Sequence, residues 1–252
     1  MDTTKEKRSF SDWAKREYRL NKLLFRSIPS ITVAIIVVSI VAMNLMASKV
    51  ILSLEWIALT GGVLISWIPF LAMDVVTKHF GAGAANRLSI VAIIIDLACV
   101  GIFAGIAAIP GEGFEAFNAT FSSVWFILLG STIAFILSAV INNFSNELIG
   151  RIFKKNPDGK LAYFTRTYVS TFIGQMVDNM VFVLLVYMLF APIFWGPEYG
   201  WSFLQCFMCS LLCALFELAL EAVFSPIGYW INSKWKKEGV GEEYLRFLRE
   251  GK

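Results

Sequence analysis

The stretch Leu88–Ile109 reads LSIVAIIIDLACVGIFAGIAAI and contains a single charged residue, Asp96. A helix needs about 20 mostly apolar residues to cross the hydrocarbon core of a bilayer. This stretch reaches that length without a Pro or a run of polar residues. Its length and composition therefore predict a transmembrane helix.

Five more stretches of the chain have the same character. Together the six are Pro29–Leu52, Trp56–Val76, Leu88–Ile109, Phe121–Ile149, Thr167–Ile193 and Ser202–Ile231. Hydrophobic residues make up 57% of the whole chain and charged residues 16%, whereas a soluble domain carries about 25% charged residues. The strands of a membrane barrel would show short alternating runs instead of continuous apolar ones. The sequence therefore predicts an all-α, polytopic membrane protein with six transmembrane helices.

The positively charged residues mark one side of the predicted membrane domain. All but one of the 22 Lys and Arg residues fall in the N-terminal tail, the second-to-third connection, the fourth-to-fifth connection or the C-terminal tail, and the exception is Lys49. The loops on the opposite side hold Glu55, Glu112, Glu115 and Glu198. Because short basic loops stay in the cytoplasm, we expect both termini to be cytoplasmic and the chain to be a multi-pass protein of a bacterial inner membrane. The net charge of +3 then reflects topology, and no nucleic-acid partner is expected.

Three regions follow from this pattern. They are a cytoplasmic amphipathic N-terminal segment (residues 1–28), a six-helix membrane transport domain (29–232) and a cytoplasmic C-terminal tail (233–252). Within the first, Ser9–Phe25 mixes aromatic residues and Leu with many Lys and Arg, which is typical of a helix lying on a membrane surface; a solvated tail is the alternative. Cys206, Cys209 and Cys213 share one helix face, where packing explains them better than a metal or redox site. No nucleotide-binding glycine motif occurs, so we expect no cofactor and no metal.

Acids and amides inside the predicted spans are the candidates for function. An ionisable side chain at the centre of a span costs about 2.5–3.5 kcal/mol on insertion, and it usually faces a cavity or a partner. Gln175 and Asp178 are three residues apart near the middle of the fifth span, so they share a helix face, as do Glu217 and Glu221 in the sixth. Any one of these groups could instead make a purely structural helix–helix hydrogen bond, and for Asp96 alone we favour that interpretation.

A pocket near the membrane midplane for a small polar solute would explain this grouping. The candidate contacts are the acids Asp74, Asp178 and Glu221, the amides Asn44, Asn142, Gln175 and Asn179, and the aromatic residues Trp67 and Phe182. A carboxylate can accept the adjacent N–H groups of a guanine edge, amides can donate to the ring carbonyl, and aromatic faces can stack on the base. A purine-like solute is compatible with these residues, and so are other polar heterocycles.

Several segments carry a family pattern. Ile68–Gly81 resembles a Pro-x-x-x-x-Asp-x-x-Thr-Glu-x-x-Gly segment, and Asn44–Lys49 resembles a first-helix signature. Glu221 with Pro226 resembles the close of a sixth helix. The most specific match is to Arg-x-x-x-Ser-x-x-x-Gly-Gln-x-x-Asp-x-x-x-Phe, by Arg166, Ser170, Gly174, Gln175, Asp178 and Phe182. In these segments the chain resembles the YhhQ-type transporters, also called the vitamin uptake transporter (VUT) family.

The resemblance implies import of queuosine precursors, the 7-deazaguanine bases used in tRNA queuosine salvage. Such bases are 7-cyano-7-deazaguanine, 7-aminomethyl-7-deazaguanine and queuine. The resemblance also implies six helices and no ATPase subunit, and it makes Asp178, Gln175, Asp74 and Glu221 the best candidates for ligand contact.

Three positions depart from the family pattern. Lys78 and Glu217 stand where the family has Glu and Lys respectively, which looks like a reciprocal charge exchange, so we expect these two side chains to approach each other. The fourth-helix Gln-x-x-Asp appears as Asn142 and Ser145, which removes one acid. Structural or coupling roles are expected for Lys78, Glu217, Arg166 and Lys49.

Two other classes of protein can be compared with this sequence. A substrate-binding subunit of a vitamin importer that needs a separate ATPase module would have this size and six helices. An intramembrane enzyme fits poorly, because no Ser–His, Cys–His or metal-ligand set accompanies the single histidine, His79. The expected partners are a small-molecule substrate of the deazapurine class and the lipid bilayer, and homo-oligomerisation is left open.

Overall fold

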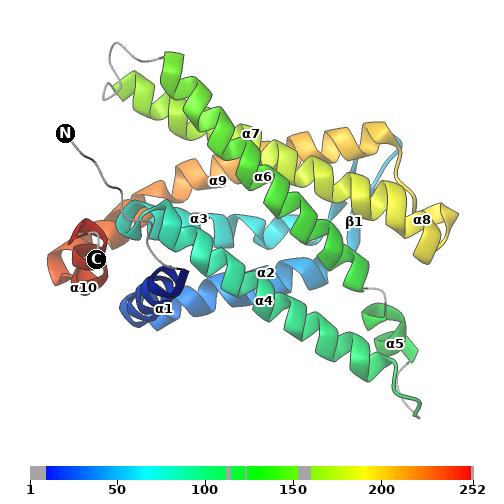
Figure 1. The fold of residues 1–252 in the computed structure, drawn as a ribbon. Coiled ribbons are helices and arrows are strands. Elements are labelled where there is room, and N and C mark those ends of the chain that lie inside the picture. Colours follow the sequence, from blue (N-terminus) through cyan, green and yellow to red (C-terminus); the bar gives the residue numbers. More distant parts are fainter. Residues whose placement is uncertain (1–9, 112–114, 123, 153–159, 251–252) are drawn as a thin grey trace.

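The computed structural model describes residues 10–111, 115–122, 124–152 and 160–250, apart from some side chains, most of them in α6 and α7. Most of these residues are helical (Figure 1). The elements are α1 (Phe10–Ser27), α2 (Ser30–Ala47), β1 (Val50–Ser53), β2 (Ala58–Thr60), α3 (Val63–Phe80), α4 (Ala82–Ala107), α5 (Glu115–Phe121), α6 (Val124–Ile152), α7 (Lys160–Val183), the π-helix η1 (Leu184–Phe190), α8 (Ala191–Phe194), the 3-10 helix η2 (Pro197–Tyr199), α9 (Phe203–Glu238) and α10 (Glu242–Glu250).

Five stretches of the described chain are long and apolar enough to cross a membrane. They are Ser30–Ala47, Val63–Phe80, Ala82–Ala107, Thr171–Phe194 and Phe203–Phe224, and α6 adds a shorter apolar stretch, Val124–Ser138. Only 17% of the apolar window in α4 is buried inside the protein, so most of that helix presents apolar side chains outward, as a lipid-facing helix does. The chain is thus a polytopic membrane protein; the six-span topology with both termini in the cytoplasm stays a prediction.

The expectation of an all-α chain is wrong at one place, the connection between α2 and α3. The first span was expected to run to Leu52 and the second to begin at Trp56, but α2 ends at Ala47 and residues 50–60 form an antiparallel β1–β2 hairpin. The hairpin returns onto α2, where a Cβ on Gly61 or Gly62 would lie 3.0 Å from the Met46 or Met43 carbonyl oxygen. Glycine at both positions therefore allows this close approach.

Two of the predicted spans differ from simple α-helices. The fifth continues from α7 through the π-helix η1 into α8, so its hydrogen-bonding pattern changes partway across the bundle. The sixth, α9, begins at a capping box made by Ser202 and Gln205 and runs on to Glu238, past the predicted end at Ile231. Part of the predicted C-terminal tail is therefore helical.

The amphipathic segment predicted at the N-terminus forms the helix α1, which packs against α10 at one end of the bundle, whereas β1, α5 and α8 lie at the other end (Figure 1). Leu24 of α1 is fully buried in a cluster with Phe80, Leu88 and Tyr244. Arg87 of α4 forms an ion pair with Glu17 of α1, at 2.7 Å. The predicted surface helix is thus packed on the ends of α3 and α4.

Candidate substrate-binding site

A cavity of about 300 Å³ lies inside the bundle, lined by side chains of α2, α3, α4, α6, α7 and α9. We call it the chamber. Its volume is at the small end of the roughly 300–1,000 Å³ of small-molecule sites. A second cavity of about 50 Å³ adjoins the chamber and shares five lining residues with it, Met43, Asn44, Phe70, Ser131 and Asp178. The two cavities are therefore neighbours between helices that are distant in sequence.

One wall of the chamber is formed by α7, through Gln175 and Asp178. The helical repeat predicts a shared face for them, and the structure places both side chains at the chamber. Asp178 accepts a hydrogen bond of 3.0 Å from the Ser138 hydroxyl of α6. Gln175 is only 3% exposed, yet neither its amide nitrogen nor its amide oxygen has a partner among the residues described. Because buried amides are costly to leave unpaired, Gln175 is a strong candidate for contact with a bound solute or water.

A second wall brings together Asn44 of α2 and Asp96 of α4. The Asn44 amide donates a hydrogen bond of 2.5 Å to Asp96 Oδ2, and the two residues are 2% and 1% exposed. Asp96 Oδ1 and the Thr132 hydroxyl of α6 have no partner in the described part of the chain, although both residues line the chamber. The helix–helix hydrogen bond predicted for Asp96 is confirmed by this contact. The position of Asp96 at the chamber was not predicted from the sequence.

Asp74 and Glu221 also line the chamber, and Lys78 lies beside Asp74. Lys78 forms an ion pair of 2.6 Å with Asp74, one turn away on α3, and it acts electrostatically on Glu221 of α9. The predicted approach of Lys78 to Glu217 is wrong. Glu217 lies beside Ser66 of α3, and Lys78 is twelve residues after Ser66 on α3, which is about 18 Å along the helix.

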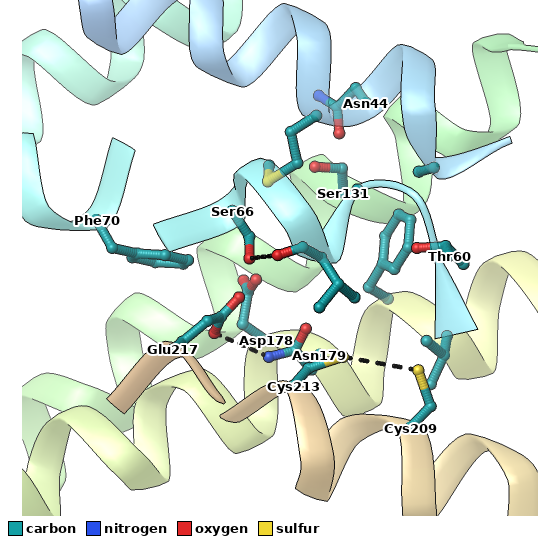
Figure 2. A pocket seen from close by; sticks show the side chains of 16 residues that line it. Asn44, Thr60, Ser66, Phe70, Ser131, Asp178, Asn179, Cys209, Cys213 and Glu217 are labelled. Carbon is teal, nitrogen blue, oxygen red and sulfur yellow. Dashed lines mark hydrogen bonds between the residues drawn. The ribbon is translucent and has the colours of Figure 1, made fainter. Parts of the chain in front are cut away.

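The smaller cavity contains the other buried acid, Glu217, which is 2% exposed. Figure 2 shows it beside Asn179 and Asp178, with Asn44 and Ser131 on the far side of the cavity. The Asn179 amide donates to Glu217 Oε2 at 3.2 Å and to the backbone oxygen of Gln175 at 2.9 Å. The amide nitrogen of Asn179, a residue predicted to contact substrate, therefore donates its hydrogen bonds to other protein atoms.

The predicted aromatic contacts are divided between the cavities and the helix packing. Trp67 lines neither cavity; it stacks on Phe224, with ring centroids 4.4 Å apart. Phe182 lines only the smaller cavity, and Phe70 lines both. Phe70 is therefore the better candidate for stacking on a planar ligand.

Three other predicted residues are not placed at the site. Lys49 is exposed and lines neither cavity, although its backbone oxygen accepts a hydrogen bond from Gly61. The side chains of Asn142 and Arg166 lie outside the described residues. The cysteines Cys209 and Cys213 are free thiols at the smaller cavity, with sulfurs 3.8 Å apart. Over the described ranges, no group of three His, Cys, Asp or Glu residues could hold a metal ion.

A polytopic helical membrane protein that encloses a chamber with unpaired polar groups has the architecture of a small-molecule transporter. The comparison with family models agrees, because residues 60–231 match the family described as "Putative vitamin uptake transporter". This match covers more than half of the chain, so the protein belongs to that family. No curated protein and no solved structure gives a significant match. Membership of a transport family identifies the chain as a multi-pass membrane transporter that binds a small-molecule substrate.

Proposed function

We propose that this protein imports 7-deazaguanine bases, the precursors of tRNA queuosine, across the bacterial inner membrane and without an ATPase of its own. The proposal combines the family match with the sequence resemblance to YhhQ-type transporters and with the chemistry of the chamber. The family description names vitamins as a class; the deazapurine substrate is the proposal's own refinement.

The observation that carries the proposal is that neither amide atom of Gln175 has a partner among the described residues, while the Asp178 carboxylate lies at the same chamber. A guanine-like edge offers adjacent N–H donors, which a carboxylate accepts, and a ring carbonyl, to which an amide donates. Phe70 supplies an aromatic face at the same cavity. Together these groups match the donors, the acceptor and the flat ring of a 7-deazaguanine base.

Access to the chamber differs between its two ends. Thr77 and Asn86 line the chamber and are exposed, and they lie near the end of the bundle where α1 and α10 pack. Towards the other end, Tyr187 of the π-helix η1 stacks on Trp201 at 4.1 Å and donates a hydrogen bond to the Ala47 carbonyl oxygen. With both termini cytoplasmic, this arrangement corresponds to an inward-facing state. Import then requires the packing around η1 to open, and π-helices are often found at functional sites.

Ligand-induced thermal stabilisation of the purified protein tests the proposal. The panel contains 7-cyano-7-deazaguanine, 7-aminomethyl-7-deazaguanine, queuine, guanine, riboflavin, thiamine and biotin. We expect the 7-deazaguanine bases to raise the Tm and Asp178→Asn to abolish that shift. The matched control is Glu217→Gln, which changes a buried acid that does not line the chamber and should keep the shift. Stabilisation by a vitamin alone, or an unchanged shift in Asp178→Asn, would refute the proposed substrate or site.

A further inference from the structure

The Asp96–Asn44 pair gives the chamber a second acidic wall. Asp96 is on α4 and Asn44 on α2, whereas Asp178 and Gln175 are on α7. Figure 2 shows Asn44 and Asp178 on separate sides of the smaller cavity. Both residues also line the chamber. Asn44 occupies Oδ2 of Asp96, and Oδ1 is left buried and unpaired among the described residues. A bound ligand can therefore be contacted by a carboxylate from two directions.

Among the described side chains, Asp96 and Asp178 each accept a hydrogen bond from a neutral group, whereas Asp74 has a cationic neighbour. Asp74 is paired with Lys78, and Lys78 also acts on Glu221. Asp178 accepts a hydrogen bond from the Ser138 hydroxyl and lies on the α7 wall, which is proposed to contact the N–H edge of the base. Asp96 accepts a hydrogen bond from a neutral amide, and no Lys, Arg or His whose side chain is described forms an ion pair with it. A buried carboxylate without a cation is costly, so a cationic group on the ligand would relieve that cost.

We propose that Asp96, held in place by Asn44, binds an ammonium substituent of the ligand, so that the chamber prefers an amine-bearing 7-deazaguanine to an uncharged one. This inference rests on the proposed function. If Asp178 and Gln175 hold the N–H edge of the six-membered ring, a substituent on C7 of the five-membered ring points away from α7. The wall that carries Asp96, whose Oδ1 has no partner in the described part of the chain, then receives the substituent. Asp96 is thus a specificity-determining residue.

The affinities of two bases that differ only at C7 test this inference. 7-Aminomethyl-7-deazaguanine carries an ammonium group at neutral pH, and 7-cyano-7-deazaguanine carries none. By titration calorimetry of the purified protein, we expect the aminomethyl base to bind at least about tenfold more tightly, which is the size expected of a hydrogen bond between charged groups. Asp96→Asn should bring the ratio of the two affinities close to one, mainly by weakening the aminomethyl base, and Asp96→Glu should retain the preference.

The matched control is Glu217→Gln, which neutralises a buried acid that does not line the chamber; the ratio should not change. Equal weakening of both bases by Asp96→Asn would make Asp96 a structural residue and overturn the inference. If Asp96→Asn does not fold, the wild type decides, because equal affinity or a preference for the cyano base overturns the inference as well. Wild-type protein that binds neither base would refute the proposed function itself, and the inference with it.

Discussion

Replacing Gln175 by Leu separates the binding role of the chamber from its structural role. In the folded protein the Gln175 amide has no partner among the described residues, so the substitution removes no described protein–protein hydrogen bond. With a base bound, it removes up to two hydrogen bonds, each contributing about 0.5–1.5 kcal/mol. The expected loss of binding free energy is therefore about 1–3 kcal/mol, or about 5- to 150-fold in Kd. The Tm of the ligand-free protein should stay the same or rise.

Asn179→Leu is the matched comparison, one turn further along α7. Asn179 donates to Glu217 Oε2 and lines only the smaller cavity. Its loss removes a donor from a buried carboxylate, which costs about 1–3 kcal/mol and lowers the Tm by about 2–4 °C for each kcal/mol. The Kd of the base should change less than threefold. Calorimetric titration gives the Kd of the base for each variant, and thermal unfolding gives the Tm of each ligand-free variant. The reasoning would be refuted if Gln175→Leu bound the base as tightly as the wild type. It would also be refuted if Gln175→Leu and Asn179→Leu changed the Kd and the Tm in the same way.

Two further substitutions test the packing around the chamber. In Gly130→Ala the new Cβ would lie 2.5 Å from Val186 Cγ2 of η1, so we expect a loss of about 1–3 kcal/mol in stability, measured as a lower Tm. Gly101→Ala is the control, with open space around its Cβ, and equal Tm values for the two variants would contradict the close approach of α6 to η1. Leu24→Ala removes a fully buried side chain that holds α1 on the bundle, so limited proteolysis should cut α1 faster than in the exposed-site control Tyr18→Ala. Unchanged protection of α1 in Leu24→Ala would show that the contact is weak.

Most of the helical architecture could be predicted from the sequence, because crossing a bilayer requires a long apolar run that is visible in any one segment. The β1–β2 hairpin could not. Val50, Ile51 and Leu52 continue the apolar run of α2, and a short apolar run does not distinguish strand from helix. The hairpin brings Gly61 and Gly62 back onto α2, and a hydropathy profile, which is read along the chain, does not show such a contact.

The candidate site shows the same division between local and non-local information. The shared face of Gln175 and Asp178 follows from the helical repeat alone, and the structure places both residues at the chamber. The partners across helices depend on how deep each helix sits relative to its neighbours. The predicted pairing of Lys78 with Glu217 is wrong for this reason, since Glu217 lies at the level of Ser66 and not of Lys78. The sequence predicts a helix–helix hydrogen bond for Asp96 but not its partner, because Asn44 is 52 positions away.

Uptake of radiolabelled 7-deazaguanine bases into proteoliposomes tests the central claim most directly, with purified protein and no ATP or other subunit present. The account predicts that wild-type vesicles exchange the labelled base across the membrane faster than empty vesicles, and that Asp178→Asn vesicles do not. Exchange that needs added ATPase subunits, or equal exchange by Asp178→Asn, would contradict it.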